Sequence, residues 1–117
     1  MNASEAGKLL ALMALYDNRT VGNADVLAWL KVIGDLSYQD AETAVTEHYR
    51  DTTERIMPAH VRQRVKAIRA ERLRLTPVPA PPAELLDNAD AYRAYLRAAA
   101  RRIADGQPSR LRIGGAS

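Results

Sequence analysis

The stretch GNADVLAWLKVIGDLSYQDAETAVTEHYR, residues 22–50, decides the fold class. In its first half, apolar residues recur at spacings of three and four, which predicts a helix with one buried stripe. The stripe consists of Val26, Leu27, Trp29, Leu30 and Ile33. Gly22 and Asn23 supply a flexible residue and a helix cap before it, and Gly34 ends it. Trp29 is better explained as a core residue than as a surface anchor, because the chain has no phenylalanine.

Ser37 and Asp40 predict the start of a further helix. Ser37 can accept a backbone N–H group of the first turn, and Asp40 lies where the helix dipole favours negative charge. One face of this helix carries Tyr38, Ala41, Val45, His48 and Tyr49, and the polar run from Arg50 to Arg55 ends it. The carboxylates around it favour a solvated surface over an acid–base pair. His48 and His60 lack a third ligand, so we expect them to serve neither a metal nor catalysis.

Helices are also predicted on both sides of this stretch. A first helix begins after Asn2 or Ser4, either of which can cap it. Its apolar residues are Leu9, Leu10, Leu12, Met13 and Tyr16. A fourth helix runs from about Pro58 to Leu75, since proline suits the first position of a helix. Its apolar stripe is Val61, Val65, Ile68 and Leu75. The period-two alternation of strands does not occur over a useful length, so the predicted fold class is all-α.

Four prolines between Thr76 and Pro82 cannot propagate a helix and predict a stiff, extended spacer. Beyond it, Asp87 or Asn88 can cap a last helix that Gly106 closes. We therefore expect a small four-helix N-terminal domain followed by a proline-rich linker, one C-terminal helix and a flexible tail. Their expected ranges are 1–75, 76–83, 84–106 and 107–117.

The composition excludes several kinds of chemistry. The absence of cysteine rules out disulfides, thiol catalysis, iron–sulfur clusters and cysteine-based zinc sites. Neither the phosphate-binding pattern GxxxxGK[ST] nor the dinucleotide pattern GxGxxG occurs, and no serine has the surroundings of a nucleophile elbow. We expect no enzyme activity, cofactor, metal or small-molecule substrate. No apolar run could span a bilayer and no secretion signal is recognisable, so we expect a cytoplasmic protein with no membrane partner.

Charge is divided unevenly along the chain. Residues 1–57 carry five basic and nine acidic groups, for a net charge of −4, whereas residues 58–117 carry twelve and five, for +7. The predicted fourth helix is the most basic segment, and its candidate binding residues are Arg62, Lys66, Arg69 and Arg72. Such cations can neutralise phosphates or meet an acidic protein surface, and charge alone does not choose between them. They can also form a merely solvated face.

A tryptophan-bearing helix that ends in Ile33-Gly34-Asp35-Leu36 precedes a second helical segment, and Pro58 follows that segment. That segment contains Ala41, Ala44, Val45, His48 and Tyr49. This order resembles the small phage replication proteins that load or inhibit a hexameric replicative helicase of the DnaB type in tailed bacteriophages. In that family a tryptophan helix precedes a helix of the form A-x-x-A-V-x-x-[HY]-[YF], and a proline opens the next helix. The resemblance covers residues 3–70.

The resemblance implies an ATPase-free adaptor in the bacterial cytoplasm, with a folded N-terminal domain and a C-terminal part that engages the helicase. The expected contact residues are Tyr92, Arg93, Tyr95, Leu96, Arg97 and Ile103. A linked helix can raise the avidity for a ring of identical subunits. Two alternatives stay open. One is a small DNA-binding phage regulatory protein that uses the basic fourth helix, and the other is a phage protein that binds some other host protein.

Overall fold

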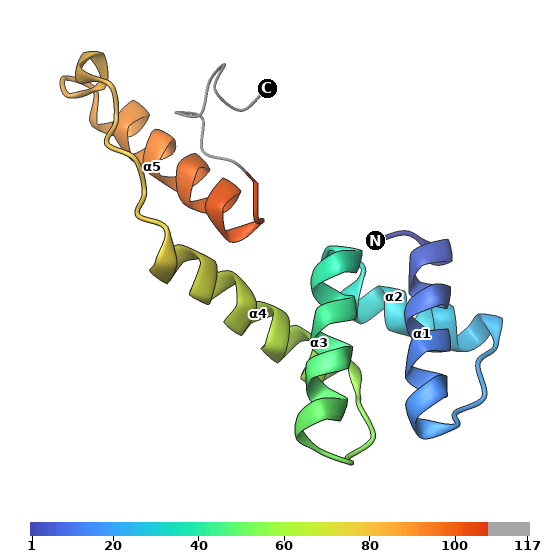
Figure 1. Cartoon of the computed structure of the whole chain (residues 1–117). Helices are drawn as coiled ribbons and strands as arrows, with labels where there is room; N and C mark the ends of the chain where they lie inside the picture. Colours follow the sequence, from blue (N-terminus) through green and yellow to red (C-terminus); the bar gives the residue numbers. More distant parts are fainter. Residues whose placement is uncertain (108–117) are drawn as a thin grey trace, which may run out of the picture. The chain divides into compact units, whose positions relative to one another are not determined.

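The computed structural model describes residues 1–107, and within this range it contains only helices and their connections (Figure 1). The elements are α1 (Ala3–Asp17), α2 (Asn23–Ile33), α3 (Tyr38–Asp51), α4 (Pro58–Leu75), the 3₁₀ helix η1 (Ala83–Leu85) and α5 (Ala89–Ala104). The predicted all-α fold class is confirmed. The tail predicted from residue 107 lies outside the described residues except for Gln107. No helix within residues 1–107 is long and apolar enough to cross a membrane.

Local capping chemistry explains where the first helices begin. The Asn2 side chain accepts the Glu5 N–H at 2.8 Å while the Glu5 carboxylate accepts the Asn2 N–H at 3.0 Å, a complete capping box. The prediction that Asn23 caps α2 is wrong, because Asn23 is already helical and Gly22 is the N-cap. Gly22 has no side chain to offer, and the Asp25 carboxylate instead accepts the Gly22 N–H at 2.8 Å.

The later helices have the caps that the sequence predicted, but the C-terminal helix, expected over 84–106, begins at Ala89 and ends at Ala104. The Ser37 hydroxyl accepts the Asp40 N–H at 3.1 Å, and the Asn88 side chain accepts the Ala91 N–H at 3.0 Å. Pro58 is the first residue of α4, where its missing N–H costs nothing. At the end of α5, Gly106 has a φ of 78° and its N–H bonds to Ile103 O. The Gln107 N–H reaches back to Arg102 O, which completes a Schellman motif.

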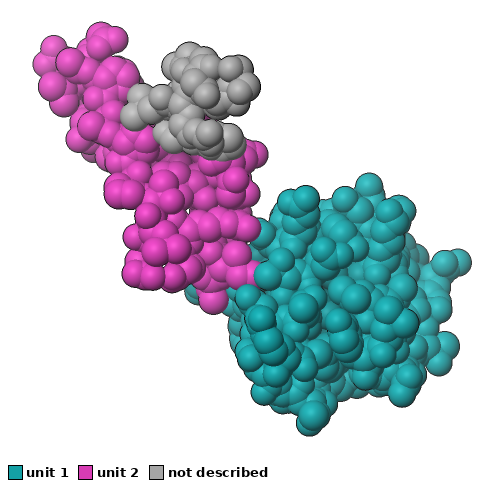
Figure 2. Space-filling view, viewed as in Figure 1, with its two compact units in different colours: residues 1–66 teal, residues 67–117 magenta. Residues whose placement is uncertain are grey.

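The chain divides into two compact units, coloured separately in Figure 2. Unit 1 comprises Met1–Lys66 and unit 2 comprises Ala67–Ser117, so the boundary falls inside α4. In unit 1, α1 packs against both α2 and α3 (Figure 1). The largest fully buried side chains of this unit are Leu9, Leu10, Met13, Ile33, Val45, Ile56, Val61 and Val65. Trp29 is 8% exposed and joins this core, as predicted.

Some residues of the predicted apolar stripes lie outside the core. Leu27, predicted to be buried, is 60% exposed, and Tyr16 and Leu75 are also exposed. The core side of α2 is formed by Val26, Trp29, Leu30 and Ile33. Leu27 follows Val26 by about 100° around the helix axis, which turns it away from that side. A helix that is apolar on all sides contains several equally good stripes, so the sequence pattern could not identify the buried one.

Unit 2 has a much smaller apolar core among its described residues. The buried apolar residues of residues 67–107 are Ala99, Ile103 and Ala104. The proline segment is extended and leads to η1, which contacts α5 and which the sequence did not predict. Polar contacts hold the end of α5: the Arg69 guanidinium pairs with the Asp105 carboxylate, and Arg72 Nη1 donates to Ala104 O at 2.8 Å.

Candidate binding surfaces

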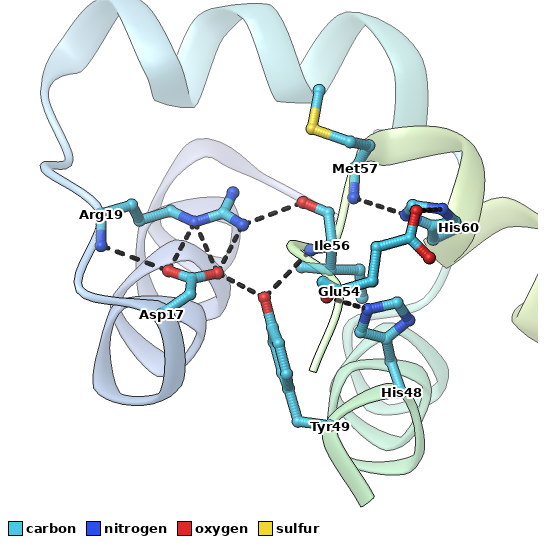
Figure 3. A network of polar contacts seen from close by, with 8 residues as sticks. All are labelled: Asp17, Arg19, His48, Tyr49, Glu54, Ile56, Met57 and His60. Carbon is cyan, nitrogen blue, oxygen red and sulfur yellow. Dashed lines mark hydrogen bonds and ion pairs between the residues drawn. The ribbon is translucent and has the colours of Figure 1, made fainter. Parts of the chain in front are cut away.

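A polar network in unit 1 fixes the connection between α3 and α4 (Figure 3). Arg19 Nη2 donates to the Asp17 carboxylate at 2.6 Å and to Ile56 O at 2.9 Å. The Tyr49 hydroxyl donates to Asp17 and accepts the Ile56 N–H at 2.9 Å. The hydrogen bond from Arg19 lowers the pKa of Asp17 to about 2, against a counteracting effect of burial. The network joins α1, α3 and the loop 52–57, so we assign it to the scaffold.

The two histidines take part in the same scaffold. His48 is buried, and its Nε2 donates to Glu54 O at 2.6 Å, so Nε2 carries a proton. His60 Nδ1 accepts the Met57 N–H at 2.9 Å, next to the start of α4. The interpretation of His48 as a hydrogen-bonded, buried residue is therefore confirmed. Within residues 1–107, no three histidine, aspartate or glutamate side chains are grouped so that they could hold a metal ion.

Most arginines of α4 contact other parts of their own unit. In unit 1, Arg62 Nη1 donates to Asp35 at 2.6 Å and to Val32 O at 2.8 Å, and Arg64 pairs with Asp51 at 3.1 Å. In unit 2, the contacts of Arg69 and Arg72 with the end of α5 are described above, and Arg74 pairs with Glu71. Of the four predicted binding residues on α4, three thus have intramolecular partners.

Lys66 is the fourth predicted binding residue, and it is exposed. Within the described part of the chain it makes no hydrogen bond or ion pair. For the basic residues of α4 to bind phosphate together, Arg62 and Arg69 would have to break their ion pairs with carboxylates and pair with phosphate instead. The role of these four residues in binding stays a prediction, and the structure gives three of them a structural role.

The two sides of α5 differ in character. Ile103 is 5% exposed, and Tyr92, Tyr95 and Leu96 are half-buried within unit 2. Arg93 and Arg97 lie on the opposite side and are exposed. The predicted contact set on α5 therefore separates into inward-facing apolar residues and outward-facing cations. Of its apolar members only Ile103 is buried, and the role of the set in partner binding stays a prediction.

An exposed apolar surface instead occurs on α2. We call Ala24, Leu27, Ala28 and Val32 the outer face of α2. All four are exposed, with Leu27 at 60% and Val32 at 42%. The sequence interpretation missed this face because it assigned Leu27 to the core. The available signal was the composition of α2, which has two charged residues, Asp25 and Lys31, among eleven.

Comparison with known proteins gives no relative. No protein family, curated protein or solved structure matches this chain. The surfaces described above therefore carry the functional argument.

Proposed function

We propose that this protein is a non-enzymatic adaptor of the bacterial cytoplasm that binds a hexameric replicative helicase of the DnaB type. In this role it loads or regulates the helicase during phage DNA replication. The observation that carries the proposal is the exposed outer face of α2. This helix lies at the centre of the resemblance to helicase loaders, because it carries Trp29.

The physical argument starts from the cost of exposing apolar surface. Apolar helix faces are normally buried, yet α2 leaves Leu27 60% and Val32 42% exposed. Burying one leucine side chain against a partner contributes about 1.5–3 kcal/mol. Stable interfaces contain such apolar side chains near their centre, surrounded by polar ones. Asp25 lies at the edge of the outer face of α2, whereas Lys31 lies within it, between Leu27 and Ala28 around the helix axis, and both are exposed polar groups.

Contacts on the inner side of α2 hold the helix, and with it the outer face of α2, in a fixed position. Trp29 and Ile33 are buried, and the Arg19 guanidinium lies 5.5 Å from the centre of the Trp29 ring. Arg62 binds the end of α2 through Val32 O. Because these contacts fix the helix, little ordering is needed when its outer side meets a helicase subunit, and six identical subunits offer six equivalent sites.

The test is co-elution of the full chain with a DnaB-type helicase in size-exclusion chromatography, followed by a titration of affinity. We expect Leu27→Ser to weaken binding about tenfold, since it removes one buried leucine contact of the interface. Leu15→Ser is the matched control, because Leu15 is 80% exposed and lies on α1, outside the outer face of α2. Circular dichroism checks that both variants keep the wild-type helicity.

Two results would contradict the proposal. One is a wild-type chain that does not bind the helicase. The other is equal weakening by Leu27→Ser and Leu15→Ser, which would indicate a nonspecific apolar effect. Light scattering of the isolated chain provides a further check: a dimer that Leu27→Ser dissociates would assign the outer face of α2 to a second copy of this chain.

A further inference from the structure

The arginines of α4 and α5 differ in how they are used. Arg62, Arg64 and Arg69 on α4 are each paired with a carboxylate. On α5, Arg97 and Arg101 are exposed, and their side chains make no hydrogen bond or ion pair within the described part of the chain. The sequence alone pointed to α4 as the basic surface, whereas within residues 1–107 α5 carries two exposed arginines without a side-chain partner and α4 carries only Lys66 in that state.

These cations form one continuous surface, which we call the α5 arginine face. It consists of Arg93, Arg97 and Arg101 with Ala94 and Ala98 beside them, all exposed. A spacing of four residues keeps the three arginines on one side of the helix, about 6 Å apart along its axis. Arg93 also donates to Asp90 at 2.7 Å. No acidic residue occurs between Asp90 and Asp105, so the face is purely cationic over most of the helix.

Such a row is unfavourable for the helix itself. Like charges at a spacing of four residues repel one another, and the repulsion is relieved when an anion lies across them. On α4 the relief comes from carboxylates of the same chain. On α5 no residue of the described chain provides it for Arg97 and Arg101, which leaves both guanidinium groups available to an external anion.

We propose that the α5 arginine face binds the phosphate backbone of a nucleic acid. Arginine suits this ligand because its planar guanidinium can donate two parallel hydrogen bonds to one phosphate. The small side chains of Ala94 and Ala98 allow the backbone to approach the helix closely. The inference goes beyond the proposed helicase contact, which concerns α2 in unit 1, and it does not depend on it.

The composition of the face favours nucleic acid over an acidic protein surface. Protein interfaces depend on large aromatic or aliphatic side chains near their centre. The aromatic residues of α5, Tyr92 and Tyr95, are half-buried on its other side, and the α5 arginine face itself contains only arginine and alanine. Phosphate binding needs cations alone, and it carries no base specificity.

The test measures binding of the full chain to labelled 20-nucleotide single strands and 20-base-pair duplexes by fluorescence anisotropy, without helicase, over a range of salt concentrations. We expect an affinity that falls steeply with salt. In the double variant Arg97→Gln/Arg101→Gln, the slope of log K against log salt should decrease by about 1 per arginine and the affinity by about tenfold. The preference between single strand and duplex identifies the physiological form.

Lys8→Gln/Arg55→Gln is the matched control, because both residues are exposed in unit 1 and the variant loses the same two charges. It should retain the wild-type salt slope. Equal effects of the two double variants would overturn the proposal, since net charge alone would then explain binding. Absence of binding to both oligonucleotides would also overturn it. If Arg97→Gln/Arg101→Gln then weakened only the helicase complex, the face would be a protein-binding surface.

Discussion

Unit 1 and unit 2 are both built from helices, but different interactions hold them together. Unit 1 has a core of eleven buried apolar residues drawn from all four of its helices and from the loop 52–57. Among the described residues of unit 2, Ala99, Ile103 and Ala104 are the buried apolar ones, and polar contacts at the end of α5 supplement them. A small core opens at a lower free energy, so α5 should exchange its amide hydrogens faster than α3. Unit 1 is therefore expected to be the more stable part of the chain, and α5 in unit 2 the part that opens more readily.

Truncating one core residue in each unit tests this difference most strongly. Leu9→Ala should lower the free energy of unfolding by about 2–5 kcal/mol, because Leu9 is completely buried in unit 1. Ile103→Ala should leave the unfolding of unit 1 unchanged and increase amide exchange in α5 only. Urea denaturation combined with residue-resolved hydrogen exchange measures both effects. Equal loss of protection in α3 from both variants would show that the two units unfold together.

The buried ion pair of unit 1 should make its stability depend on acid. The pKa of Asp17 is lowered from 3.8 to about 2 in the folded state, so its contribution is present above pH 4 and is lost as the pH falls toward 2. Asp17→Asn should therefore cost on the order of 1–2 kcal/mol at pH 7 and little at pH 2. Thermal unfolding across this pH range measures the difference.

Glu47→Gln is the control for this pH dependence. Glu47 makes only a surface contact with Arg50 at 3.7 Å, so its replacement should change stability by less than about 0.5 kcal/mol at every pH. A constant cost of Asp17→Asn from pH 7 to pH 2 would contradict the assignment of the low pKa to Asp17.

Replacing a glycine with alanine should change stability in opposite directions in the two units. Gly106 has a φ of 78°, so Gly106→Ala should destabilise the end of α5 by about 1 kcal/mol. Gly7 lies inside α1, where an added Cβ would meet no atom within 4 Å, so Gly7→Ala should stabilise unit 1 by about 0.5–1 kcal/mol. Hydrogen exchange of α5 and urea unfolding of unit 1 measure the two effects. A neutral or stabilising effect of Gly106→Ala would contradict the left-handed conformation of Gly106.

Local sequence chemistry predicted the helices better than it predicted the surfaces. Asn2, Ser37, Pro58 and Asn88 mark helix starts because caps and first-turn prolines act within a few residues. Leu27 was misassigned because the pattern of α2 is apolar on every side. The loop residue Ile56 is buried in the core although it follows a polar run, since its position depends on contacts with Tyr49 and Arg19.

The sequence by itself determined the all-helical fold, most of the helix starts and the break at the proline segment, because these depend on hydrogen bonds and backbone restrictions between near neighbours. Only the tertiary structure decided which side of α2 faces the core and which arginines are paired. The partners Arg62 and Asp35, for example, are 27 residues apart, and Arg69 and Asp105 are 36 apart. Periodicity describes one helix at a time, whereas an ion pair forms where folding brings two distant segments together.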